Sequence, residues 1–107
     1  MNGGSVLFLG VEGLALAAAE RRNLRRVQPA GIVLVTRNIG RAEELRDLVG
    51  ELRAAVPQAI LCLDAEGGRV DRLRGVVAPA PAASALAHCR PATARRAGRL
   101  LGAALRQ

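Results

Sequence analysis

The chain has 107 residues, enough for one domain, and its hydrophobic fraction of 50% excludes a disordered tail. Its 16 basic residues, all Arg, face nine acidic ones for a net charge of +7, and two Cys with one His exclude a disulfide scaffold, a Cys-rich zinc site and two-histidine catalysis. One aromatic residue argues against a base-stacking surface, and no apolar run reaches the ~18 residues of a membrane-spanning helix.

The first half of the chain predicts two strands, each followed by a helix. Residues 5–10 form a short apolar run that ends in Gly and predicts a buried strand. Residues 16–27 are rich in Ala, Glu, Arg and Leu, so a helix is expected there, closed by Pro29. Residues 31–35 are unbroken and β-branched, as in parallel strands buried on both faces, and the polar residues 36–38 predict a loop.

The second half predicts two further helices and a third strand. Residues 41–56 are expected to be helical, because apolar side chains recur there with helical spacing and Pro57 follows: Leu45, Leu48, Val49, Leu52 and Val56. Residues 59–63 predict a third buried strand, in which Cys62 is expected to be a buried free thiol. Residues 64–75 are then expected to form a polar loop, 76–81 an extended segment, and 93–106 a last helix with Thr93 as its N-cap.

This order, β-α-β-α-β-loop-α, predicts an α/β fold in which residues 1–107 belong to one domain. The strands begin about 25 to 30 residues apart, the spacing of right-handed βαβ units. The apolar stretch of residues 6–19 has no preceding Arg or Lys and is interrupted by Glu12. It therefore does not fit a secretory signal, and we expect a cytoplasmic protein with reduced cysteines and no membrane partner.

The positive charge allows two interpretations. Its densest run is residues 21–26, which hold four Arg, and the other Arg residues are scattered. This distribution favours solvated helix surfaces and no nucleic-acid partner. The alternative is a small basic α/β module that binds an anionic partner such as nucleic acid, and salt-dependent binding would distinguish the two.

Residues 64–72 (Asp-Ala-Glu-Gly-Gly-Arg-Val-Asp-Arg) carry the most chemical information. They begin where a parallel strand is predicted to end, the edge that holds ligands in α/β folds. The Asp64 carboxylate could accept hydrogen bonds from sugar hydroxyls and the Arg72 guanidinium could donate them, while a purely structural pairing of Asp64 with Arg69 or Arg72 stays open. The segment fits neither a phosphate loop nor a calcium loop, so no metal and no cofactor is expected.

The same segment, extended to Leu73, resembles the D-x-E-G-G-R-V-x-R-[LF] signature of family 3 glycoside hydrolases. The nearest branch is that of the bacterial β-N-acetylhexosaminidases of peptidoglycan recycling. Other segments resemble the family in the same order along the chain, which extends the resemblance to nearly all of it: Gly13-Leu14, Glu20-Arg21, Gly31–Ile39, Glu44–Leu48, Leu52–Ala55, Pro79, Pro81 and Ala97–Leu105. Ala65 and Gly10 depart from the family pattern, where Gln and an acidic residue are common.

The resemblance implies the N-terminal portion, about three βα units, of a TIM-type (β/α)8 barrel. It further implies hydrolysis of terminal β-linked N-acetylglucosamine, with a carbohydrate ligand such as a muropeptide or glycoside. Asp64 and Arg72 would bind the sugar. The remaining residues of the segment would support the loop: Glu66, Gly67, Gly68 and Arg69.

The catalytic residues of the family are not found in this sequence. The resemblance implies an Asp nucleophile on a late strand and an acid/base His in a K-H-F-P-G-H-type stretch, and neither segment is present. His88 lies in a different context and is expected to face solvent near a helix start. We therefore assign no catalytic residue and expect the chain to be inactive alone. A third of a barrel leaves strand edges uncovered, which predicts self-association.

Overall fold

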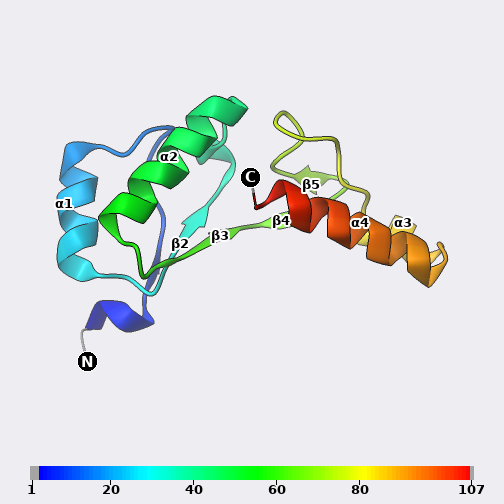
Figure 1. The fold of residues 1–107 in the computed structure, drawn as a ribbon, viewed down its shortest axis with the longest axis horizontal. Coiled ribbons are helices and arrows are strands. Elements are labelled where there is room, and N and C mark those ends of the chain that lie inside the picture. Colours follow the sequence, from blue (N-terminus) through cyan, green and yellow to red (C-terminus); the bar gives the residue numbers. More distant parts are fainter. Residues whose placement is uncertain (1–2, 107) are drawn as a thin grey trace. The chain divides into compact units, whose positions relative to one another are not determined.

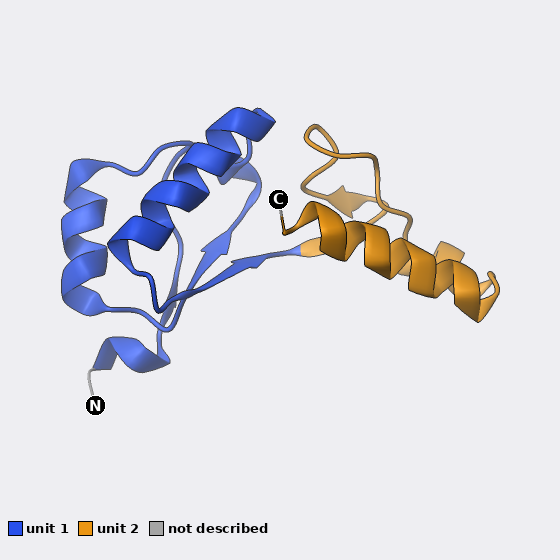
Figure 2. Cartoon of the chain, in the orientation of Figure 1, with its two compact units in different colours: residues 1–64 blue, residues 65–107 orange. Residues whose placement is uncertain are grey.

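A computed structural model describes residues 3–106, in which the chain forms two compact units, residues 1–64 and residues 65–107 (Figure 2). The fold is mixed α/β, as predicted. No helix within the described residues has the length and hydropathy needed to cross a membrane.

The first unit is a parallel sheet with helices between its strands (Figure 1). The strands β1 (Phe8–Leu9), β2 (Gly31–Leu34) and β3 (Ile60–Leu63) lie in the order β1-β2-β3. Helix α1 (Ala18–Val27) joins the first two strands, and α2 (Ala42–Ala55) joins the second pair. All pairings are parallel. The carboxyl ends of the three strands therefore meet at one edge, which we call the strand-end edge.

The core of the first unit lies between the two helices and one face of the sheet. Strands alternate their side chains between faces, so the face toward the helices carries Ile32 and Leu34 of β2. These pack with Leu24 of α1 and with Leu48 and Leu52 of α2, all at most 4% exposed. The predicted apolar stripe of the second helix is thereby confirmed.

The opposite face of the sheet is much less covered. Phe8, Gly31 and Ile60 are register partners across the three strands, and their side-chain positions share that face. Phe8 is 51% exposed and Ile60 is 62% exposed. Burial on both faces was therefore the wrong expectation for β3, and Cys62 is half-buried instead of buried. The reason is that this face of the sheet, which also carries Cys62, is little covered in the first unit. The exposure of Phe8 on the same face means that the buried strand expected at residues 5–10 was also wrong.

The second unit contains a short hairpin and two helices. Strands β4 (Ala65–Gly67) and β5 (Val70–Asp71) pair antiparallel, with an irregularity between Ala65 and Gly67. Helices α3 (Ala83–Ala87) and α4 (Pro91–Ala104) follow. None of the residues of α3 or α4 is buried.

Several predicted boundaries differ from the structure. The first strand is only two residues long, because a 3-10 helix, η1 (Gly3–Val6), occupies the start of the predicted run. Helix α4 begins with Pro91 at its first turn, where a missing N–H costs nothing, so Thr93 is not its N-cap. Turns at residues 73–77 occupy the first two residues of the segment 76–81 that was predicted to be extended.

Three local assignments are also corrected. The predicted loop after β3 contains the β4–β5 hairpin. The polar residues after β2 form the 3-10 helix η2 (Thr36–Asn38). Helix α3 was not expected. His88 lies at its C-terminal end, three residues before α4 begins, and is exposed, so its predicted place near a helix start is confirmed.

Candidate functional site

Asp64 is the residue that follows β3 directly, at the strand-end edge of the first unit. Its side chain is half-buried. The backbone of Asp64 is held in place because β3 pairs with β2 as far as Leu63, whose register partner is Leu34. A carboxylate at this place, on a rigid element and partly accessible, can accept hydrogen bonds from hydroxyl groups of a ligand.

Gly67 ends strand β4, and Gly68 is the first residue of the turn that leads to β5. Both glycines have positive φ, 78° and 62°, which side chains on an L-residue disfavour. A Cβ on Gly67 would also collide with the carbonyl oxygen of Pro81, and one on Gly68 would lie 2.6 Å from the Cβ of Ala82. The sequence predicted either a positive φ or a close approach of the backbone to a ligand. The structure shows the positive φ, together with close packing against residues 80–82 of the chain itself.

Asp71 and Arg74, which were not predicted as site residues, stabilise this turn. The backbone N–H of Ala80 donates to Oδ2 of Asp71 at 2.8 Å, and Nη2 of Arg74 donates to the carbonyl oxygen of Gly68 at 2.7 Å. A backbone bond from Gly68 to Ala80 at 2.8 Å completes the connection. Asp71 falls on an unspecified position of the signature and Arg74 lies beyond it, so the signature marked neither side chain.

Arg72 follows β5 and is half-buried, and Leu73 beside it is 5% exposed. The Nε atom of Arg72 is buried, which restricts the orientation of the guanidinium. Arg72 belongs to the second unit and Asp64 to the first. Their joint action on one ligand stays a prediction.

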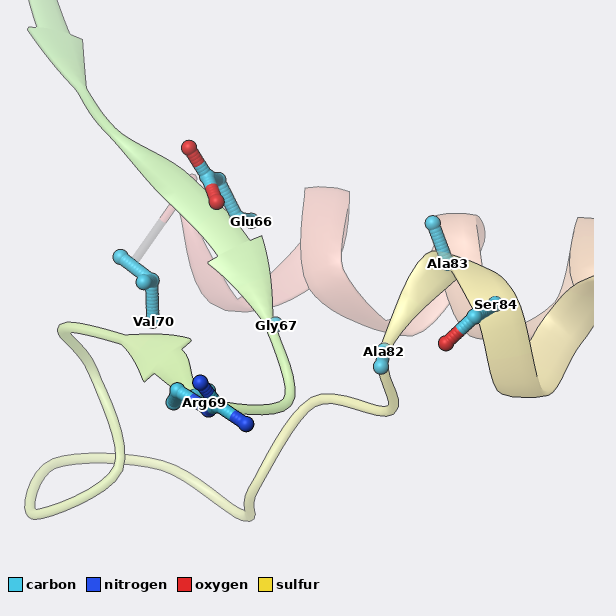
Figure 3. Close-up of a pocket in the computed structure, with 7 residues that line it drawn as sticks. All are labelled: Glu66, Gly67, Arg69, Val70, Ala82, Ala83 and Ser84. Atoms are coloured by element: carbon cyan, nitrogen blue, oxygen red, sulfur yellow. The ribbon is translucent and has the colours of Figure 1, made fainter.

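Glu66 and Arg69 border an open hollow of about 660 Å³ in the second unit (Figure 3). Both side chains are exposed. The hollow lies between the hairpin and the start of α3, and its remaining lining consists of Gly67, Val70, Ala82, Ala83 and Ser84. The loop-supporting role expected of Glu66 and Arg69 stays a prediction.

The β1–α1 and β2–α2 connections are joined at the strand-end edge by Asn38, which is fully buried. Its Nδ2 donates to the carbonyl oxygens of Val11 at 3.0 Å and Gly13 at 2.9 Å. Its Oδ1 accepts from the backbone N–H of Val35 at 3.0 Å. Nε of Arg37 donates to the same Val11 oxygen at 3.1 Å. The polar residues 36–38 predicted only a loop, so neither the burial of Asn38 nor this network was foreseen.

The remaining reactive side chains are dispersed. Cys62 and Cys89 are both free thiols, and Cys89 is exposed. Within residues 3–106, no group of three His, Cys, Asp or Glu side chains is placed to hold a metal ion.

Known proteins that are similar to this chain belong to the group that the signature indicates. No family model matches the chain. A β-hexosaminidase of Xanthomonas oryzae is 45% identical over 78 residues, which is 71% of this chain and 23% of that protein. One from Pseudomonas aeruginosa is 38% identical over 81 residues, 76% of this chain and 24% of that protein.

Solved structures agree. A family 3 β-N-acetylglucosaminidase from Paenibacillus superposes with a TM-score of 0.87 at 27% identity, over 96% of this chain and 21% of that one. NagZ from Neisseria gonorrhoeae gives a TM-score of 0.66 at 32% identity, over 73% of this chain and 23% of that one. The chain thus spans about a quarter or less of the proteins it matches.

The signature, the parallel sheet and these similarities place the chain with the family 3 glycoside hydrolases, of which it corresponds to an N-terminal part. Within that family, the resemblance is to the bacterial β-N-acetylhexosaminidases.

Proposed function

We propose that this chain forms the first part of a TIM-type barrel that hydrolyses terminal β-linked N-acetylglucosamine, and that Asp64 and Arg72 contribute to the sugar site. The observation that carries the proposal is the position of the signature. It begins at the carboxyl end of a parallel strand, where (β/α)8 enzymes bind their substrates. A solved relative, NagZ in complex with N-trifluoroacetyl-D-glucosamine, supports a carbohydrate of this class.

The chemistry of the proposed site is recognition. The Asp64 carboxylate would accept from sugar hydroxyls, and the Arg72 fork would donate to ring or hydroxyl oxygens. The nucleophile and the acid/base of a retaining glycosidase are expected in further segments of the barrel, which needs about 250 residues in total. A muropeptide as the natural substrate and a cytoplasmic location stay predictions.

Binding of N-acetylglucosamine to the isotope-labelled chain tests the sugar site. We expect saturable shifts of the Asp64 amide in ¹H–¹⁵N spectra, and we expect D64N to weaken binding at least about five-fold, because it removes a charged acceptor. D47N is the matched control, since Asp47 is an exposed residue of α2. Equal affinity of D64N and D47N for the sugar would contradict the assignment.

A second assay addresses activity. We expect no release of nitrophenol from 4-nitrophenyl β-N-acetylglucosaminide by the purified chain, because the family's catalytic segments do not occur in its sequence. Turnover that D64A abolishes would contradict this expectation.

We also propose self-association through the uncovered sheet. The outer strands β1 and β3 carry the exposed apolar residues Phe8 and Ile60, and exposed apolar edge strands pair readily with other chains. Sedimentation velocity should show oligomers whose fraction falls in I60K, because a charge on an edge strand opposes pairing. A monomeric wild-type chain at 100 μM, ~ten times a routine concentration, would contradict this proposal.

A further inference from the structure

Arg37 presents a guanidinium group at the strand-end edge, between the carboxyl ends of β1 and β2. It lies within η2, which directly follows β2 and Val35. Its Nε donates to the carbonyl oxygen of Val11, in the β1–α1 connection. Gly10 leaves room for the group, since a Cβ there would lie 3.3 Å from Nη2 of Arg37. The guanidinium therefore bridges the ends of two strands.

The acceptor that holds Arg37 is itself immobilised. Val11 is 2% exposed, and its carbonyl oxygen also accepts a bond from the fully buried Asn38. Asn38 makes two further bonds, to Gly13 and to Val35, so its side chain is fixed on both sides. A guanidinium held by such an acceptor loses less freedom on binding a ligand than one on a free surface side chain.

Arg37 has donors left for a ligand. Among residues 3–106, the Val11 carbonyl is its only polar contact, and that contact uses Nε. The two Nη groups remain, and the side chain is exposed. A planar guanidinium with two free Nη groups matches a carboxylate, which accepts two parallel hydrogen bonds.

Arg37 is also close in the topology to the proposed sugar site. The strands β2 and β3 are hydrogen-bonded neighbours, and Leu34 of β2 is the register partner of Leu63, which precedes Asp64. The residues that follow these two partners leave the sheet at the same edge. A ligand held at Asp64 that extends along this edge toward β2 would meet Arg37.

We propose that Arg37 binds a carboxylate on the group attached to the sugar, and so selects glycosides whose leaving group is acidic. The inference rests on the proposed function and deepens it, because it assigns a charge preference to the part of the ligand beyond the sugar. Asp64 would recognise hydroxyls and Arg37 the anion, and both lie in the first unit.

Two glycosides that differ only in one charge test this assignment. Phenyl β-N-acetylglucosaminide and its 4-carboxyphenyl counterpart are titrated into the labelled 107-residue chain, with the Asp64 and Arg37 amides as reporters. We expect the carboxylate to bind about three-fold more tightly at low salt, the size of an exposed ion pair. We expect R37Q to abolish this preference and R37K, which keeps the charge without the fork, to keep part of it.

R41Q is the control, because Arg41 is exposed, four residues away, and paired with Glu44 at 3.4 Å. It should retain the full preference. Equal binding of the two glycosides to the wild-type chain, or a preference that persists in R37Q, would overturn the role of Arg37 while leaving the sugar site intact. If neither glycoside shifts the Asp64 amide, the proposed function fails together with this inference.

Discussion

Replacement of Asn38 by Ala should destabilise the first unit more than any other change of a polar residue described above. Asn38 is fully buried and makes three hydrogen bonds with the backbone. In N38A, the carbonyl oxygen of Val11 keeps its bond from Arg37. The N–H of Val35 and the carbonyl oxygen of Gly13 lose the partner that Asn38 provides.

The magnitude follows from these partners. A fully buried backbone group that loses its hydrogen bond costs roughly 1 to 3 kcal/mol, so two of them would cost about 2 to 6 kcal/mol. The bonds to Val35 and Gly13 are part-buried, which predicts a loss in the lower part of this range, about 2 to 4 kcal/mol. Domains of this size are stable by about 5 to 15 kcal/mol, so the variant should remain measurable but weak. With a urea slope of about 1 kcal/mol/M, the midpoint should fall by about 2 to 4 M.

The assay is urea unfolding followed by far-ultraviolet circular dichroism, with N23A as the matched control. Asn23 is exposed on α1, where Ala is the better helix former, so N23A should equal or slightly exceed the wild-type midpoint. A midpoint for N38A within about 0.3 M of the wild type would refute the reasoning, because it would mean that the buried amide contributes no net stability.

Three further outcomes are expected. G67A should disrupt the hairpin, because its φ is +78°, and proteolysis between residues 65 and 82 should accelerate, whereas G98A, in open space on α4, should stabilise by about 1 kcal/mol. E51Q should lower the free energy of unfolding by roughly 1 kcal/mol, since Glu51 accepts from Arg21 at 3.0 Å and from the backbone N–H of Leu16 at 2.9 Å. An unchanged free energy in urea unfolding would contradict this prediction. The backbone N–H of Arg41 holds the pKa of Glu44 below its ordinary value, so its contribution to stability is present above the unfolded pKa and is lost as the pH falls through the folded one. In acid titrations of stability, E44Q should therefore lose less free energy of unfolding between neutral and low pH than the wild type.

The elements with clear periodicity were predictable. The stripe of Leu48 and Leu52 on α2 indicates a helix packed on a core, and the β-branched run at residues 31–35 indicates a central strand. The helix and the strand are both recognised by which side chains are buried, and the spacing of apolar residues along the sequence indicates this directly. The signature beginning at Asp64 was predictable for the same reason, since it starts where an apolar run ends.

The predictions that were wrong or incomplete concern features that depend mainly on contacts between residues far apart in the sequence. Whether both faces of β3 are covered depends on what packs against each face of the sheet, and no local pattern contains that information. Asn38 is polar, so it predicts a loop, yet its burial follows from carbonyl groups 25 and 27 residues earlier in the chain. The hairpin at residues 65–71 escaped notice because its strands have only three and two residues.

The connection of the hairpin to Ala80 has a consequence for the order of folding. Asp71 and Gly68 reach Ala80 over nine and about 12 residues, so the second unit is built largely from short-range contacts. The parallel sheet instead requires closure of connections of about 25 residues before any strand can pair, which costs more chain entropy. During synthesis, β1 therefore stays unpaired until β2 has been made. In that interval Phe8 and its neighbours are accessible to other chains.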